Sequence, residues 1–213
     1  TFTLSEASSS FAAEDITVSG GTLSSFTATS STVYTVIFTP IASTQSGSGS
    51  VSVAGATFTD AAGNSNTASS ATTISYDTLV PTVSLARSGS GTLNSTQTST
   101  ITFTLSEAAT DFAVGDITVS GGTIGALTTT SSTVYSVVFT PTANTNSGTG
   151  TISVAGATFT DAAGNSNTAS SATSISYDTA VPTVTITRAG SVLRSGITER
   201  ITFTLSEPSS TFA

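Results

Sequence analysis

The feature that most constrains this chain is an internal repeat. Residues 1–78 align without a gap on residues 102–179, at an offset of 101, and 59 of the 78 aligned positions are identical. Residues 52–72 recur unchanged as residues 153–173, and the phrase TFTLSE occurs a third time from Thr202. The chain is therefore a series of copies of one structural unit, and each copy has to build its core from the same pattern of residues.

The boundaries between copies are expected at two similar linkers, SYDTLVPT (75–82) and SYDTAVPT (176–183), where proline interrupts a strand pattern. This division predicts one complete domain at 78–178. Residues 1–77 are then a copy without its first strand, and residues 179–213 are the first strands of a truncated third copy. Because both ends of the chain fall within a copy, we expect it to be a window of a longer tandem array.

The complete copy is predicted to be all-β. Apolar residues alternate with Thr and Ser in short runs, β-branched residues dominate, and Gly or Pro recurs too often for helices. A repeat of about 101 residues with seven strands predicts tandem immunoglobulin-like β-sandwich domains. The seven strands are expected around residues 83–85, 101–105, 117–119, 124–127, 134–139, 152–159 and 175–177.

The composition removes several classes of function. The chain has no His and no Cys, so imidazole or thiolate catalysis, disulfides and zinc sites built on these residues are excluded. Twelve acidic residues stand against four Arg and no Lys, which leaves a net charge of −8 and argues against nucleic acid as a partner. No apolar stretch reaches the roughly 18 to 20 residues of a membrane span, so no membrane insertion is expected in this segment.

The acidic residues are predicted to gather at one end of the complete copy. We assume that the first strand runs away from the preceding linker and that successive strands run in opposite directions. The loop after the second strand and the loop after the sixth strand then lie at the end of the domain where the linker enters. These two loops and the linker bring together six potential oxygen ligands: Asp77, Glu107, Asp111, Asp116, Asp161 and Asn165. Asp111 is the exception to the repeat, because the first copy has Ser10 at that position.

Hard oxygen donors without thiol or imidazole partners suit Ca²⁺, which takes about six to eight oxygen ligands. Partial sites of the same kind are expected in the two incomplete copies, from Glu6, Asp15, Asp60, Asp178 and Glu207. A simpler interpretation is that the Asp-Ala-Ala-Gly-Asn sequence is a β-turn and that Glu107 ends a strand in solvent. The turn does not exclude a bound cation.

Five phrases, ITFTLSE, DFAVGDITVSGG, VYSVVFTP, ATFTDAAGNSNTAS and SYDTAVPTV, are similar in order and spacing to a known family. They resemble the bacterial Ig-like repeats that form the extender regions of large secreted surface adhesins, including biofilm-associated and RTX-type adhesins. The resemblance covers the whole chain. It implies an extracellular, calcium-stiffened stalk on a cell surface, whose immediate partners are the neighbouring repeats of the same polypeptide.

Besides a stalk that acts as a spacer, three other functions can be considered for these repeats. Glu107 and Asp161 could form a glycosidase pair, but the aromatic residues that would stack on a sugar fall in phase with the core, so we expect no enzyme. The repeats could themselves bind a glycan or a protein. They could also associate laterally into a surface filament or layer. Near-identity of the copies favours a spacer, because length depends on the number of copies.

Overall fold

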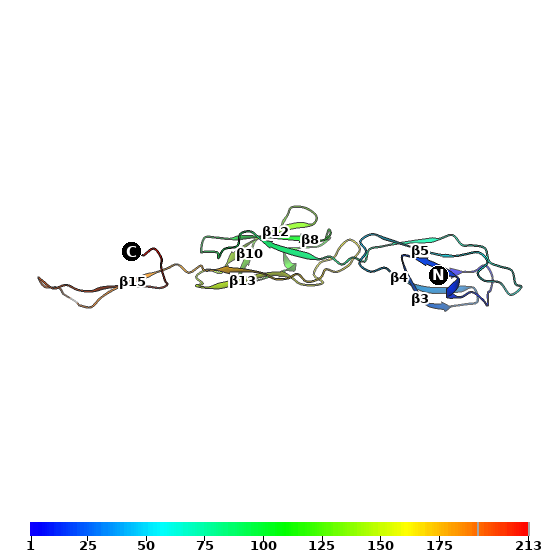
Figure 1. The fold of residues 1–213 in the computed structure, drawn as a ribbon, viewed down its shortest axis with the longest axis horizontal. Coiled ribbons are helices and arrows are strands. Elements are labelled where there is room, and N and C mark those ends of the chain that lie inside the picture. The colour runs from blue at the N-terminus through cyan, green and yellow to red at the C-terminus, as the bar shows by residue number, and fades with distance from the viewer. Residues whose placement is uncertain (191, 213) are drawn as a thin grey trace. The chain divides into compact units, whose positions relative to one another are not determined.

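The structure is a computed structural model that describes residues 1–190 and 192–212 (Figure 1). The described chain is made of β-strands and loops, with two single-turn 3-10 helices, η1 (Ala13–Asp15) and η2 (Val114–Asp116). Among these residues there is no helix with the length and apolar character needed to cross a membrane. The chain divides into two compact units, the first of which contains Thr1–Val83 together with Leu105–Phe112 and Gly156–Ala169.

The first copy contains six strands: β1 (Phe2–Thr3), β2 (Ile16–Ser19), β3 (Gly21–Ala28), β4 (Val33–Pro40), β5 (Gly47–Val53) and β6 (Thr72–Tyr76). They form two antiparallel sheets with the orders β1–β4–β3 and β2–β5–β6. Side chains of both sheets meet in one apolar core around Phe11 and Tyr34, whose rings lie edge to face with centroids 5.0 Å apart. Two sheets that share a core in this way are a β-sandwich.

The second copy contains eight strands: β7 (Val83–Arg87), β8 (Ser99–Leu105), β9 (Ile117–Ser120), β10 (Gly122–Ile124), β11 (Thr128–Thr129), β12 (Val134–Pro141), β13 (Gly148–Val154) and β14 (Thr173–Tyr177). One sheet has the order β10–β12–β8–β7, with β11 also pairing with β12, and the other has the order β14–β13–β9. With β10 and β11 taken as one interrupted strand, this arrangement is the seven-strand order of an immunoglobulin constant-type sandwich. The predicted all-β fold is confirmed.

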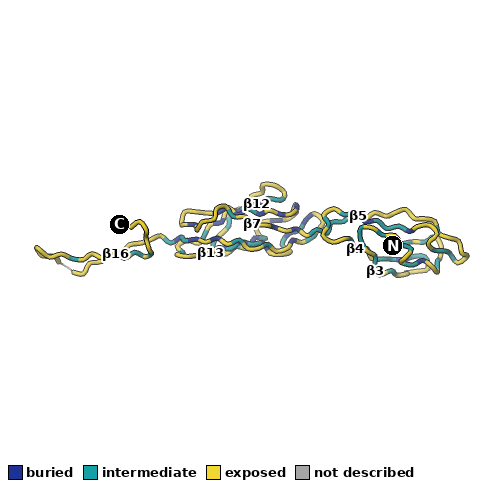
Figure 2. The backbone as a smooth tube through the Cα atoms, in the orientation of Figure 1, coloured by how far each residue is buried: buried dark blue, intermediate teal, exposed yellow. Residues whose placement is uncertain are grey.

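Alternation along the strands explains the core of the second copy. On β8, Ile101 and Phe103 are fully buried, whereas Thr100 and Thr104 on the other face are exposed. The two sheets lie so close together that a side chain added at Gly150 on β13 would collide with the ring of Phe139 on β12. Figure 2 shows the buried positions recurring along these strands. Thr and Ser therefore face water where other proteins use charged residues.

Two details differ from the strand prediction. Phe159 is buried but lies beyond the end of β13, because the side chain of Asn167 accepts hydrogen bonds from the backbone N–H groups of Thr158 and Phe159 in place of a strand partner. The weak fourth strand is split, and Leu127 belongs to neither β10 nor β11. The equivalent strand of the first copy, β3, has a register shift between Ser24 and Thr27, so this strand is irregular in both copies.

The segment predicted as the start of a third copy forms one hairpin, β15 (Val184–Arg188) with β16 (Ile201–Leu205). Two residues of this segment, Ser191 and Ala213, lie outside the described residues. Every residue of β15 is exposed (Figure 2).

Candidate metal centre

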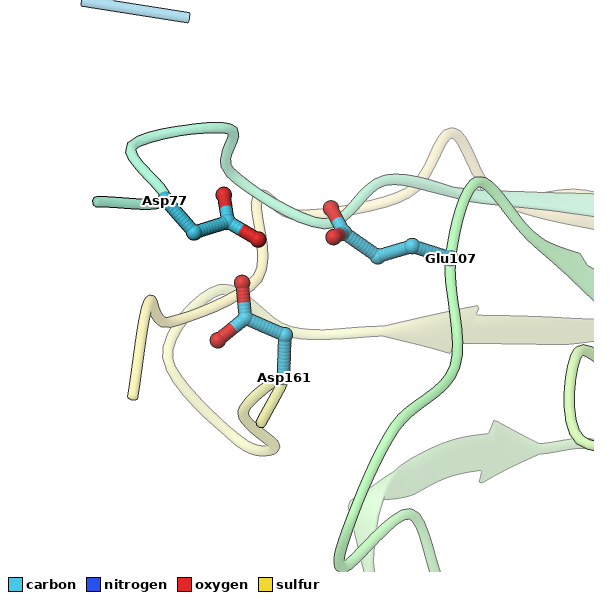
Figure 3. A group of neighbouring side chains, drawn as sticks. All are labelled: Asp77, Glu107 and Asp161. Carbon is cyan, nitrogen blue, oxygen red and sulfur yellow. The ribbon is translucent and has the colours of Figure 1, made fainter. Parts of the chain in front are cut away.

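Three of the predicted ligands lie together in the first compact unit. Asp77 directly follows β6, Glu107 lies two residues after β8, and Asp161 lies in the long loop after β13. One carboxylate oxygen of each lies within 4.8 Å of those of the other two. Figure 3 shows the three carboxylates turned toward one another from three separate segments. We call these three residues the acidic cluster.

Asp77 is positioned by the threonine that follows it. The Thr78 hydroxyl donates to the backbone carbonyl of Ile41 at 2.7 Å and accepts from the backbone N–H of Thr44 at 3.1 Å. One carboxylate oxygen of Asp77 accepts from the backbone N–H of Leu79 at 3.0 Å. The linker therefore leaves β6 in a fixed direction. The role of Thr78 is not among the predictions from the sequence, although Asp-Thr recurs in both linkers and is a visible signal.

Asp161 is held by the turn that the sequence predicted. Its Oδ1 accepts from the backbone N–H groups of Ala163 and Asn165 at 2.8 and 2.9 Å, and its Oδ2 accepts from the side-chain amide of Asn165 at 2.8 Å. Gly164 closes the turn with φ of +89°, which favours glycine. Burial of Asp161 opposes ionisation, but the hydrogen bonds from Asn165, Ala163 and Gly164 together lower the pKa of this carboxyl. Asp161 is therefore ionised at neutral pH.

Glu107 is the least satisfied member of the acidic cluster. Its side chain is 7% exposed, and its buried Oε1 has no hydrogen-bond partner among the described residues. Burial raises the pKa of Glu107, and the negative charges of Asp161 and Asp77 raise it further. Two unit charges about 5 Å apart repel by about 3 kcal/mol at an effective dielectric constant of about 20. The cluster is thus unfavourable to the folded protein unless a proton or a cation neutralises it.

The donor set suits one class of cation. Carboxylate oxygens are hard ligands, and the cluster contains no nitrogen or sulfur donor that a transition metal would prefer. Three carboxylates can supply three to six of the roughly six to eight oxygens that Ca²⁺ takes, and backbone carbonyls or water can supply the rest.

The other predicted ligands of the complete copy are placed differently. Asn165 adjoins the cluster, because its amide contacts both Asp161 and the backbone carbonyl of Asp77. Asp111 is exposed and accepts from the backbone N–H of Thr160 at 2.8 Å. Asp116 accepts from the backbone N–H of Ala113 at 2.8 Å and closes η2. Asp111 and Asp116 therefore hold loops, and the structure does not group them with the acidic cluster.

The equivalent residues of the first copy do not form a group of three. Asp60 makes the same turn as Asp161, with its Oδ2 accepting from the side-chain amide of Asn64 at 2.7 Å, and these hydrogen bonds lower its pKa. Asp15 accepts from the backbone N–H of Ala12 at 2.8 Å, as Asp116 does from Ala113. Glu6 is exposed. Among the described residues, only the acidic cluster brings three or more acidic groups this close.

The two acidic residues of the second linker region are half-buried. Asp178 repeats the linker geometry, because its Oδ1 accepts from the backbone N–H of Ala180 at 3.3 Å and Thr179 donates to the carbonyl of Thr142 at 2.6 Å. Glu207 follows β16 as Glu107 follows β8. They are not brought together with a third acid in the part of the chain that is described.

Comparison with known proteins decides the family. The family described as bacterial Ig-like domain matches this chain twice in tandem, over residues 1–76 and 77–177. The chain belongs to the bacterial Ig-like domain family. This membership confirms the resemblance seen in the five sequence phrases, and tandem bacterial Ig-like domains are typical of surface proteins. Neither the search of curated proteins nor the search of solved structures gave a match.

Proposed function

We propose that these bacterial Ig-like domains are a non-catalytic spacer in an extracellular surface protein, and that Ca²⁺ bound by the acidic cluster stiffens the chain. Tandem copies with nearly the same sequence support a spacer, since each added copy adds length without a new activity. The partners of each domain in this role are the neighbouring copies in the same polypeptide.

The observation that carries the calcium proposal is the buried, unpartnered Oε1 of Glu107 beside two further carboxylates. A buried polar atom without a partner destabilises a folded protein by about 1–3 kcal/mol, and more when it is charged. In folded proteins the large majority of such atoms have a partner, which is another protein group, an ordered water or an ion. A divalent cation among the three carboxylates would satisfy Glu107 and replace the repulsion by attraction.

Stiffening would follow from where the ligands lie along the chain. Asp77 belongs to the linker after the first copy, whereas Glu107 and Asp161 belong to loops of the second copy. A cation held by all three would tie the linker to both loops. By linkage, binding only to this ordered arrangement stabilises it by about 2.7 kcal/mol when free Ca²⁺ is 100-fold above its dissociation constant.

The test uses matched variants of the 213-residue chain. Calcium binding is measured by calorimetric titration for Asp161→Asn and for the equivalent change Asp60→Asn. Both replace an aspartate that makes the same turn, so any effect on the turn itself is shared. We expect Asp161→Asn to weaken Ca²⁺ binding at least tenfold and Asp60→Asn to leave it unchanged.

Glu107→Gln and its equivalent Glu6→Gln form a second matched pair. We expect only Glu107→Gln to abolish the rise in melting temperature that Ca²⁺ produces in the parent chain. Small-angle scattering with Ca²⁺ and with chelator then tests stiffening. Equal Ca²⁺ binding by the two Asp variants, an equal Ca²⁺-dependent rise in melting temperature in the two Glu variants, or the same scattering profile in both conditions would contradict the proposal.

A further inference from the structure

The linker after the first copy bonds to both copies through two consecutive residues. On the side of the second copy, the backbone carbonyl of Asp77 accepts from the side-chain amide of Asn165, and its carboxylate lies beside those of Glu107 and Asp161. Thr78 makes its hydrogen bonds with the first copy, in the loop between β4 and β5. All of these residues belong to the first compact unit. A single step along the chain therefore separates the acidic cluster from the first copy.

Three hydrogen bonds attach Thr78 to the loop of the first copy. Its hydroxyl donates to the backbone carbonyl of Ile41 at 2.7 Å and accepts from the backbone N–H of Thr44 at 3.1 Å. Its backbone N–H donates to the carbonyl of Thr44 at 2.8 Å. Two of the three bonds use the hydroxyl, so the attachment depends on the side chain of Thr78 as well as on the backbone.

The loop has an unusual backbone conformation at the residue before Thr44. Ser43 has φ of +54°, a value that residues other than glycine seldom adopt. With Ser43 in this conformation, both the N–H and the C=O of Thr44 bond to Thr78. Backbone strain of this kind persists only where the surrounding structure fixes it. The bonds to Thr78 are one such constraint, so the linker and the loop hold each other.

The same attachment recurs at the second linker. The hydroxyl of Thr179 donates to the carbonyl of Thr142 at 2.6 Å and accepts from the N–H of Thr145 at 3.0 Å, and its N–H donates to the carbonyl of Thr145 at 2.8 Å. Asn144 has φ of +53°. The loop reads IAST at 41–44 and TANT at 142–145, so the geometry is kept although the sequence differs. The attachment is therefore a repeated feature of the linkers.

We propose that Thr78 couples the acidic cluster to the first copy: a cation held by Asp77 orders the loop at 41–44 through the Thr78 hydroxyl, and the loop holds Asp77 in place for the cation. This inference rests on the calcium proposal. The coupling is reciprocal, because two contacts that each order the same linker favour one another. Thr78 is a positioning residue, since it acts through Asp77 and not on the cation itself.

The first measurement is calcium affinity, by calorimetric titration of the 213-residue chain and three variants. Thr78→Val removes the hydroxyl and should weaken Ca²⁺ binding about fivefold, because the cation alone must then order the linker. Thr78→Ser keeps the hydroxyl and should bind like the parent chain. Thr179→Val is the matched control. It removes the same bonds in the other compact unit, so the affinity of the acidic cluster should not change.

Hydrogen exchange separates coupling from a general loss of stability. The backbone N–H of Ile41 donates to the carbonyl of Gly20 within the first copy, and none of the variants removes this bond. We expect saturating Ca²⁺ to slow exchange of this N–H about fivefold in the parent chain and in Thr78→Ser. In Thr78→Val, saturating Ca²⁺ should leave the rate unchanged. A general loss of stability would instead speed exchange by the same factor with Ca²⁺ and with chelator.

Failure of this inference can be distinguished from failure of the calcium proposal. If the parent chain binds no Ca²⁺, the calcium proposal fails and this inference fails with it. If the parent chain binds Ca²⁺ but Thr78→Val binds it equally well, only the inference is overturned. The same holds if Thr179→Val loses as much affinity as Thr78→Val, or if Ca²⁺ does not change the exchange of Ile41 in the parent chain.

Discussion

The side-chain amide of Asn165 donates a hydrogen bond to the backbone carbonyl of Asp77 at 3.2 Å, across 88 residues of sequence. The same amide group also holds the carboxylate of Asp161 at 2.8 Å. Asn165 therefore connects the turn that carries Asp161 to the linker that carries Asp77. It positions two members of the acidic cluster before any ligand binds.

Asn165→Ala is expected to destabilise the protein more than the equivalent change Asn64→Ala. Both variants lose the amide bond to the turn aspartate, but only Asn165→Ala also loses the bond to the linker. One additional hydrogen bond corresponds to about 1 kcal/mol, or about 4–8 °C in melting temperature for a domain of this size. Differential scanning calorimetry in chelator measures the difference. Equal melting temperatures of the two variants would show that the linker contact does not contribute.

The pH dependence of stability should have an acidic maximum in metal-free buffer. The pKa of Glu107 is raised above its ordinary value of 4.5 by burial and by two neighbouring acids. The folded state therefore binds this proton more tightly than the unfolded chain, and stability increases as the pH falls through the raised pKa toward 4.5. Urea unfolding between pH 7 and pH 4.5 should show this increase in the parent chain and lose it in Glu107→Gln.

At lower pH the trend should reverse. The pKa values of Asp161 and Asp60 are lowered from their ordinary value of 3.8, and the hydrogen bonds of each turn depend on the ionised carboxylate. Their contribution to stability is therefore present above 3.8 and is lost as the pH falls through the folded pKa values. A stability curve that falls steadily from pH 7 to pH 4.5 would contradict the assignment of Glu107, and a curve that does not fall below pH 3.8 would contradict the assignment of Asp161 and Asp60.

Asn167 should be among the most sensitive polar positions of the second copy. It is 4% exposed, its Oδ1 accepts from the backbone N–H groups of Thr158 and Phe159 at 2.9 and 3.0 Å, and its amide donates to the carbonyl of Thr168 at 2.9 Å. Asn167→Ala would leave these groups without partners, at a cost of about 2–4 kcal/mol. Chemical unfolding measures the loss.

The matched control is Asn66→Ala in the first copy. Asn66 makes the same bonds to Thr57 and Phe58 but is only half-buried, so water can replace them. The first-copy variant should therefore lose less stability. A larger loss for Asn66→Ala would contradict the role given to burial.

Much of this fold could be predicted from alternation along the sequence. The apolar positions of the second strand, Ile101, Phe103 and Leu105, are buried as the period of two requires. The assignment of Phe159 to the sixth strand was wrong, because this residue lies beyond β13 and the side chain of Asn167, eight residues later, accepts hydrogen bonds from the backbone N–H groups of Thr158 and Phe159. Hydrogen bonds between the backbone and a side chain eight residues away leave no periodic signal in the sequence.

Strand direction also predicted which end of the domain carries the acids, and the structure brings Asp77, Glu107 and Asp161 together there. It could not separate these three from Asp111 and Asp116. Whether a carboxylate faces its neighbours or bonds to the backbone depends on displacements of a few ångströms within a loop, and strand direction specifies only the end of the sandwich. Asp116, for example, turns back to the backbone N–H three residues before it.

Close approach of the two sheets should make Gly150 intolerant of a side chain. An added Cβ would collide with the ring of Phe139, which is fully buried and has no room to move. Gly150→Ala is therefore expected to cost about 1–3 kcal/mol. Gly91→Ala is the control, because no atom lies within 4 Å of its added Cβ, and it should change stability by less than about 0.5 kcal/mol. Chemical unfolding of the two variants measures the difference, and equal stabilities of Gly150→Ala and Gly91→Ala would contradict the close packing of the sheets.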